Sequence, residues 1–181
     1  MEFLRAFHAC VELLPRDGER ALAAMFDLTA QRLVRFAMTT TGNQPDAEDA
    51  LQSAFSRIAA RPRLLAAADT PWPYLIRTVR NESLRLIRRR RSASDQESMD
   101  SFPAKSDSVE NLLDDEETSD HVRRILQSLP RSQYEVVILK HWEELTFAEI
   151  AETLALSQNT VASRYRYAME KLYRSLESLI R

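Results

Sequence analysis

Glycine is nearly absent from this chain, which has only Gly18 and Gly42 among its 181 residues. An average protein has roughly 7% glycine. Phosphate-binding loops and tight β-hairpin turns depend on glycine, because they need positive φ angles or a close backbone approach. The sequence therefore argues against both and predicts an all-α fold.

Apolar residues recur at helical spacing through most of the chain. Pro15 ends the first such stretch, and residues 42–44 form a turn before Pro45, which is tolerated in the first turn of a helix. Residues 61–69 are expected to be a connection. In the second helix we expect an apolar side made of Leu22, Met25, Phe26, Leu33 and Phe36. Helices are predicted over residues 3–14, 19–39, 45–60, 71–91, 122–129, 133–143, 147–154 and 158–179.

The net charge of −2 conceals strong charge asymmetry along the chain. Residues 77–91 carry seven arginines against Glu82, whereas residues 95–120 carry ten acids against Lys105. Such blocks indicate either a polyanionic partner or an acidic segment that shields a basic surface.

The acidic stretch also marks a domain boundary. Its many Ser, Asp and Glu residues cannot bury enough apolar surface to offset the entropy lost on ordering. We therefore predict two small helical domains, residues 1–91 and 121–181, joined by a flexible acidic linker over residues 92–120. No segment looks like a signal peptide or a membrane span, and we expect a cytoplasmic protein without membrane insertion.

The helix predicted over residues 71–91 has two chemically different sides. Its apolar side should pack against a core, with Trp72 more suited to packing than to base stacking. Leu84 is an exception within the basic side. A helical wheel gathers the polar residues Arg77, Arg80, Asn81, Arg85 and Arg88 opposite the apolar residues Trp72, Leu75, Ile76, Val79, Ser83, Leu86 and Ile87.

Residues 145–161 have the layout of a helix-turn-helix. Thr146 is expected to cap its first helix and Ser157 its second. The second helix should bury Val161, Tyr165, Ala168, Met169 and Leu172. Short polar side chains and an arginine then point outward from its first turns, as a helix that reads the major groove requires.

Two sets of motifs resemble the bacterial RNA polymerase sigma factors of the small, two-domain extracytoplasmic-function (ECF) type, in the sigma-70 superfamily. In the first half, LVRFA (33–37), DAEDALQ (46–52) and PYLIRTVRN (73–81) are similar to the domain that binds core polymerase and melts the promoter. In the second half, Leu129-Pro130, EIA (149–151) and Thr160-Val161 are similar to the domain that reads the promoter. The two sets stand in the family's order.

This resemblance implies three groups of site residues. Acidic and polar residues after Pro45 correspond to the helix that binds the polymerase clamp, although complementing the helix dipole would also explain Asp46 and Glu48. The implied core-polymerase site is Asp46, Glu48, Asp49 and Gln52. The implied minus-ten DNA site, which includes the base-capturing loop 61–69, is Arg61, Arg63, Arg77, Arg80, Asn81, Arg85 and Arg88. The implied minus-thirty-five DNA site is Gln158, Asn159, Thr160, Ala162, Ser163, Arg166 and Tyr167.

The same resemblance implies the partners. They are core RNA polymerase, through its clamp, and promoter DNA, whose minus-ten element the protein helps to open to start transcription. We expect a monomer when the protein is free, no cofactor and no metal. Control by an anti-sigma protein and control by the acidic segment both remain open.

Several positions depart from the family pattern. Ser53 replaces an acid, Arg85 an aspartate, and Ala155 the glycine of the turn, while Glu143-Glu144 stands where a glycine is common. In the last helix, Ala162 replaces a basic residue and Arg166-Tyr167 inverts the usual order. The promoter sequence is therefore not predicted.

Other classes of protein explain less of the chain. A response-regulator type of transcription factor would need a sensor domain upstream, and the first half lacks α/β alternation. An adaptor that binds polymerase without DNA would leave the arginine-rich helix unexplained. An enzyme is not expected, because His8, His121 and His141 lack metal-ligand spacing and Cys10 has no basic neighbour.

Overall fold

The computed structural model describes residues 2–94, 125–126 and 128–180, and all regular structure within these ranges is helical. The chain divides into two compact units, Met1–Ser108 and Val109–Arg181. Most of the predicted acidic linker lies outside the described residues. Its first residues, 92–94, instead extend the preceding helix, so the basic helix is longer than expected.

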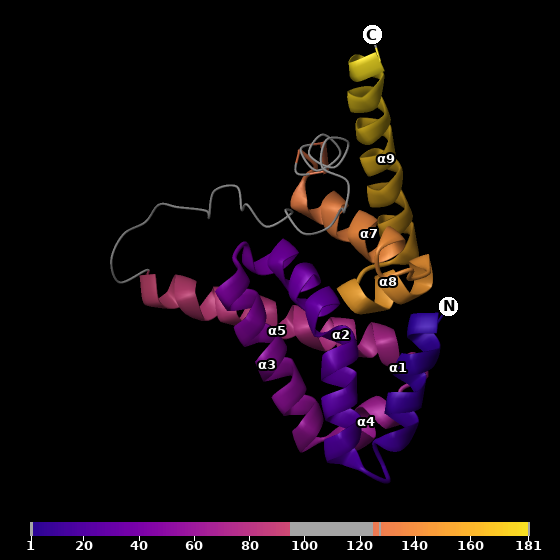
Figure 1. Ribbon diagram of the computed structural model, residues 1–181. Coiled ribbons are helices and arrows are strands. Elements are labelled where there is room, and N and C mark those ends of the chain that lie inside the picture. Colours follow the sequence, from indigo (N-terminus) through magenta and orange to yellow (C-terminus); the bar gives the residue numbers. More distant parts are fainter. Residues whose placement is uncertain (1, 95–124, 127, 181) are drawn as a thin grey trace. The chain divides into compact units, whose positions relative to one another are not determined.

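The described part of the N-terminal unit, residues 2–94, contains five helices (Figure 1): α1 (Glu2–Leu13), α2 (Gly18–Thr41), α3 (Gln44–Ala60), α4 (Pro62–Ala66) and α5 (Pro71–Ser94). Helices α2, α3 and α5 pack against one another, and α1 packs mainly on α2. Their shared core includes Met25, Leu33, Phe36, Leu75 and Ile76, each at most 1% exposed. Burying each of these side chains contributes about 1.5–3 kcal/mol.

Trp72 is a packing residue, as its place on the apolar side of α5 predicts. It is 2% exposed, and its ring meets Phe3 at 4.9 Å and Phe7 at 5.1 Å, both near edge-on. These contacts attach α1 to the start of α5. The prediction for Phe26 was wrong: this residue is 38% exposed, although its ring meets that of Phe55 edge-on at 5.1 Å.

The turn between α2 and α3 lies where the sequence predicts it but is shorter, because α2 runs on to Thr41 and Gln44 is already the first residue of α3. Gly42 has a φ of 81°, in the left-handed region that favours glycine. Asn43 then caps α3, since its side chain accepts a hydrogen bond from the Asp46 amide. The connection over 61–69 differs from the prediction because it contains α4, a single turn that begins at Pro62 and buries Leu65.

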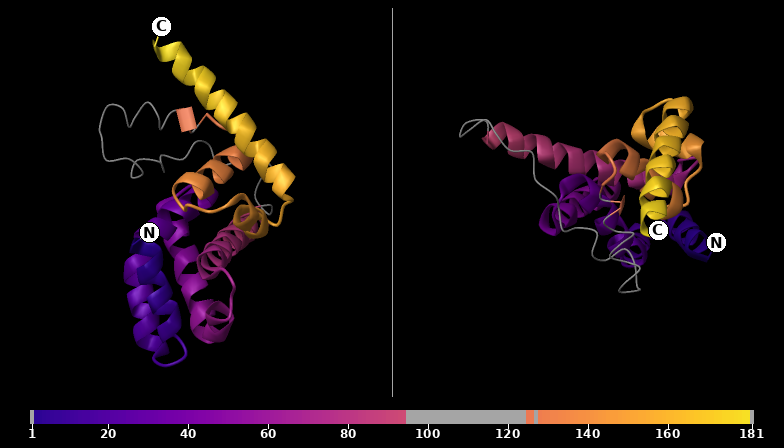
Figure 2. Two further views of the ribbon diagram at one scale, coloured as in Figure 1. Left: turned by 90° about the vertical axis from the view of Figure 1, so that its right-hand side faces the viewer. Right: turned by 90° about the horizontal axis from the view of Figure 1, so that it is seen from above.

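The C-terminal unit contains α7 (Arg131–His141), α8 (Phe147–Leu154) and α9 (Gln158–Ile180). Helix α7 begins two residues before its predicted start and ends two residues earlier. The preceding predicted helix lies partly outside the described residues, although Ile125, Leu126 and Leu129 are buried. Figure 2 shows α9 running on past α7 and α8. Of its predicted stripe, Val161 and Ala168 are buried as expected, whereas Tyr165, Met169 and Leu172 are only half-buried.

Among the described residues of this unit, two non-glycine residues have left-handed backbone conformations, and both stand where the family commonly has glycine. Glu144 has a φ of 58° and Ala155 a φ of 55°. Ala155 is the C-cap of α8, and its amide donates to the carbonyl oxygens of Ala151 and Glu152. A Cβ atom disfavours this conformation, whereas glycine adopts it readily.

We expect Ala155→Gly to raise the free energy of unfolding of the C-terminal unit by about 0.5–1 kcal/mol, because relief of strain exceeds the entropy that glycine adds to the unfolded chain. Denaturant unfolding of the full chain measures the change. Ala162→Gly is the matched control: it lies inside α9, where the same substitution should cost about 1 kcal/mol. Equal destabilisation by both variants would contradict the strain at Ala155.

Candidate polymerase and nucleic-acid interfaces

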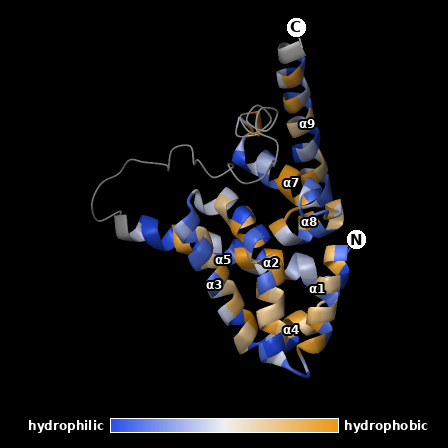
Figure 3. Ribbon diagram, in the orientation of Figure 1, coloured by the Kyte–Doolittle hydropathy of each residue, from blue (hydrophilic) through white to orange (hydrophobic). Residues whose placement is uncertain are grey.

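Helix α5 separates its basic residues from its core residues as the helical wheel predicts. Trp72, Leu75, Ile76, Val79 and Ser83 are buried. Leu86 and Ile87 are only half-buried and lie toward the end of the helix. Figure 3 shows that this end of α5 is strongly hydrophilic. The predicted basic side is exposed at Arg77, Asn81, Arg85 and Arg88 and half-buried at Arg80.

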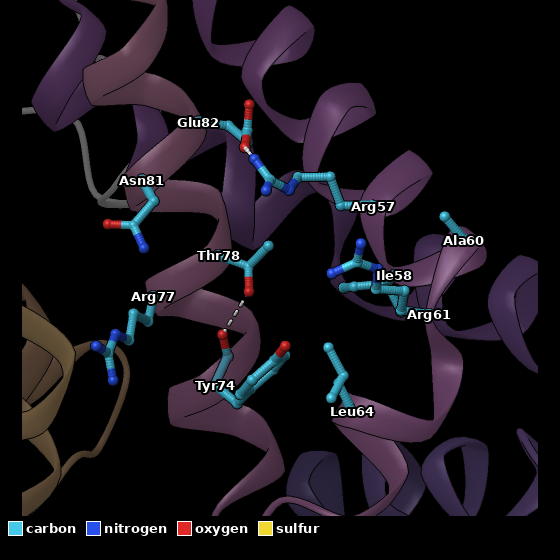
Figure 4. Close-up of a pocket in the computed structure, with 10 residues that line it drawn as sticks. All are labelled: Arg57, Ile58, Ala60, Arg61, Leu64, Tyr74, Arg77, Thr78, Asn81 and Glu82. Carbon is cyan, nitrogen blue, oxygen red and sulfur yellow. Dashed lines mark hydrogen bonds and ion pairs between the residues drawn. The ribbon is translucent and has the colours of Figure 1, made fainter.

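Two adjoining clefts follow this basic side, and Asn81 lines both. The first, of about 600 Å³, lies between the end of α3, the start of the 61–69 connection and α5 (Figure 4). It is lined by Arg57, Ile58, Ala60, Arg61, Leu64, Tyr74, Arg77, Thr78, Asn81 and Glu82. The second, of about 500 Å³, is lined by Asn81, Leu84, Arg85, Arg88, Arg89 and Ser92.

The clefts bring together most, but not all, of the predicted minus-ten residues. Arg61 and Arg77 line the first cleft with Asn81, and Arg85 and Arg88 line the second. Arg63 is exposed on α4 and lines neither cleft, and Arg80 lines neither as well. The arrangement offers cationic walls and the half-buried ring of Tyr74, which suits a single strand with unstacked bases.

Three charged residues of the cleft walls, Arg57, Glu82 and Arg89, were not among the predicted site residues. Arg57 reaches from α3 to Glu82 on α5, with Nη1 2.5 Å from Oε1 (Figure 4). Arg85 Nη1 lies 3.5 Å from the other oxygen, Oε2. Glu82 is 6% exposed. The i,i+3 spacing of Glu82 and Arg85 indicates an ion pair from the sequence alone. The pairing of Glu82 with Arg57, in contrast, depends on how α3 packs against α5. Arg89 extends the basic side of α5.

The predicted core-polymerase residues divide into two groups. Glu48, Asp49 and Gln52 are exposed along α3. Asp46 is 2% exposed, so its carboxylate does not form part of that surface. The family resemblance grouped it with the others, but the fold directs it inward.

Asp46 instead joins the start of α3 to the end of α5. Its Oδ2 accepts a hydrogen bond of 2.9 Å from Asn43 Nδ2, and its Oδ1 lies 2.5 Å from Arg90 Nη2. The amide of Asp46 donates in return to Asn43 Oδ1 at 2.9 Å. The residue therefore has a structural role, in addition to its favourable place near the positive end of the helix dipole.

The helix-turn-helix has the predicted caps at both helices. Thr146 and Glu149 form a reciprocal capping box at α8, and Ser157 Oγ accepts a 3.1 Å hydrogen bond from the Thr160 amide at α9. The residues exposed on the first turns of α9 are Gln158, Asn159, Ala162, Arg166 and Tyr167, whereas Thr160 and Ser163 are half-buried. The hydroxyls of those two bond locally, to Ser157 Oγ and to the Asn159 carbonyl.

The described part of the chain also bears on metal, thiol and membrane-spanning sites. Among these residues no group of three or more His, Cys, Asp or Glu side chains is placed to hold a metal ion. Burial raises the pKa of the Cys10 thiol, which disfavours the thiolate. In the same ranges, none of the helices has the length and hydropathy to cross a bilayer.

Two family descriptions match separate parts of the chain. Residues 25–93 match Sigma-70 region 2, which covers most of the N-terminal unit and all of the first cleft. Residues 119–172 match Sigma-70, region 4, which includes the helix-turn-helix.

Curated relatives agree with these matches. The chain is 32% identical over 146 residues to the ECF RNA polymerase sigma factor SigE of Mycolicibacterium smegmatis, a match spanning 79% of this chain and 56% of that protein. It is 30% identical over 151 residues to the RNA polymerase sigma-E factor of Streptomyces avermitilis, spanning 81% of this chain and 79% of the relative.

Solved structures share the fold at lower identity. The sigma factor RpoE from Bartonella quintana, crystallised with the anti-sigma factor NepR, has a TM-score of 0.63 at 20% identity, with coverage of 84% of this chain and 94% of that one. CnrH, in complex with the cytosolic domain of CnrY, has a TM-score of 0.61 at 20% identity, with coverage of 96% and 98%. With both regions present in order, the chain belongs to the sigma-70 family of RNA polymerase sigma factors, and within it to the ECF type.

Proposed function

We propose that this protein binds core RNA polymerase, directs it to specific promoters and helps to open the minus-ten element at the start of transcription. The observation that carries the proposal is the occurrence of regions 2 and 4 together, each on its own helical unit. Residues 1–91 would bind polymerase and minus-ten DNA, residues 92–120 would connect the units, and residues 121–181 would read the minus-thirty-five element.

Binding energy would drive the strand opening that we propose. Separating promoter DNA costs on the order of 1–2 kcal/mol per base step, so the protein must favour single-stranded bases over duplex. A cationic cleft beside an aromatic ring supplies that preference, because phosphates bind the guanidinium groups while bases stack. Sigma factors are initiation factors, and no catalytic group is needed on this chain.

Partners follow from the same proposal. The exposed acids of α3 would bind a basic surface on the polymerase clamp, and the helix-turn-helix would bind promoter DNA. We also propose control by an anti-sigma protein, since the structurally similar RpoE was solved with the anti-sigma factor NepR and CnrH was solved with the cytosolic domain of CnrY. The free protein would be a monomer that acts where polymerase acts, in the cytoplasm.

Run-off transcription with purified core polymerase on genomic fragments tests the function. We expect discrete transcripts from a subset of fragments only when the protein is added. Permanganate reactivity should then reveal unpaired thymines at the start sites of those fragments. Polymerase binding without initiation on any fragment would favour an adaptor that does not bind DNA and would contradict the proposal.

Asp49→Ala is expected to weaken binding to core polymerase about fivefold, because it removes an exposed charge from the proposed contact surface of α3. Titration of labelled protein with core polymerase measures the dissociation constant. Asp27→Ala, which removes an exposed acid from α2, is the control and should leave it unchanged. If Asp49→Ala binds as tightly as the wild type, Asp49 is not part of the clamp contact.

A further inference from the structure

A buried carboxylate lies in the cleft that we propose for DNA. Glu82 is 6% exposed and lines the first cleft among arginines of α3 and α5. An acid at this place would repel phosphate if it stood alone. Its neighbours therefore decide whether it opposes DNA binding or organises it.

Both oxygens of Glu82 face a guanidinium group. Oε1 lies 2.5 Å from Arg57 Nη1 on the α3 wall, and Oε2 lies 3.5 Å from Arg85 Nη1, one turn further along α5. The two cations together outweigh the single acid. Each guanidinium group has five N–H donors, and the Glu82 carboxylate can accept hydrogen bonds from only some of them. The remaining N–H groups can donate to a ligand.

The paired arginines still reach solvent. The side chains of Arg57 and Arg85 are 61% and 62% exposed, whereas that of Glu82 is 6% exposed. Glu82 therefore contacts each arginine from the buried side of the cleft and leaves the rest of each guanidinium group exposed to solvent. The family often has an aspartate at position 85. This chain instead has Arg85 there, and its carboxylate, Glu82, lies three residues earlier.

We propose that Arg57 contacts the DNA backbone and that Glu82 is a positioning residue, which holds Arg57 and Arg85 ready for phosphates of the separated strand. This inference rests on the proposed function and adds a contact from α3, the helix that also carries the exposed acids proposed to bind polymerase. Holding both side chains before DNA arrives reduces the entropy lost on binding.

The test uses holoenzyme, assembled from core polymerase and the full chain, on a promoter found by run-off transcription. Binding of a fluorescent single strand from its opened region is measured over a range of salt concentrations. We expect Arg57→Gln to lower affinity about threefold to tenfold and to reduce the slope of log K against log salt by about 0.7, the share of one phosphate contact. Arg5→Gln, which removes an exposed arginine from α1, is the matched control and should change neither quantity.

Glu82→Gln separates positioning from repulsion. It retains both arginines, so we expect the salt slope to stay as in the wild type while affinity falls about threefold. The loss should be smaller in an Arg57→Gln background, because one of the two positioned groups is already gone. Thermal unfolding of each variant shows how much of the protein is folded at the assay temperature.

Two results would overturn the inference. Tighter binding by Glu82→Gln would mean that the carboxylate only repels DNA, and an unchanged salt slope for Arg57→Gln would mean that Arg57 serves only to join α3 to α5. Neither result affects the proposed function, which depends on whether wild-type holoenzyme initiates transcription.

Discussion

Replacing Asp46 by alanine is expected to lower the free energy of unfolding of the N-terminal unit by about 2 kcal/mol. This value lies within the usual range for hydrogen bonds to a charged group. The substitution removes the contact with Arg90, which is 2.5 Å from Oδ1, and the hydrogen bond from Asn43. Arg90 is 64% exposed and is hydrated after the change, so the loss stays below that of a fully buried ion pair. Thermal unfolding should show a midpoint lowered by about 10 °C.

Asp49→Ala is the matched comparison, because it removes the same functional group from an exposed position on the same helix. Its stability should stay within about 0.5 kcal/mol of the wild type, while its binding to polymerase falls. Asp46→Asn keeps an acceptor for Asn43 but loses the charge, so an intermediate stability is expected. An unchanged unfolding midpoint for Asp46→Ala would contradict the structural role assigned to Asp46.

The contrast between Asp46 and Asp49 shows where sequence reasoning ends. Spacing after Pro45 predicted a helix with acids in its first turns, and α3 confirms it. The same spacing could not separate an acid that binds a partner from one that joins two helices. That distinction depends on Arg90, which is far along the chain and is brought to Asp46 only by the packing of α3 on α5.

Helix positions were largely predictable because their determinants are local. Thr146 and Ser157 cap α8 and α9, and Gly42 takes the left-handed conformation that ends α2. Local patterns fail where burial is set by distant elements. Phe26 lies on the apolar side of α2 but is left 38% exposed.

The cationic site was predictable along α5 and not across to α3. A wheel of a single helix gathers Arg77, Asn81, Arg85 and Arg88, and all four line the clefts. Arg57 lies 25 residues from Glu82 in sequence, so neither its ion pair nor its place in the cleft wall was visible from periodicity. Arg63, by contrast, was expected in the site and lies outside both clefts.

Arg166→Ala is expected to weaken use of promoters by about 1–3 kcal/mol and to relax the preference at one position of the upstream element. Arg166 is exposed on the early turns of α9, and its guanidinium carbon lies 5.1 Å from the ring centroid of Tyr167. The cation is therefore placed at the end of the helix that a helix-turn-helix presents to base edges. Transcription from a library with a randomised upstream element measures the preference at each position.

The pattern of loss identifies the kind of contact that Arg166 makes. A base contact changes the preference at one position, whereas a phosphate contact weakens all sequences alike and lowers the salt slope by about one. Arg174→Ala is the control on the same helix: its side chain is 74% exposed and pairs with Glu170 at 2.6 Å, two turns beyond Arg166. We expect no change of preference from that control, and an unchanged library profile for Arg166→Ala would remove Arg166 from the promoter-reading surface. Because Arg166-Tyr167 inverts the order usual in the family, a profile altered at a single position would also show that the inverted pair still places its cation against a base.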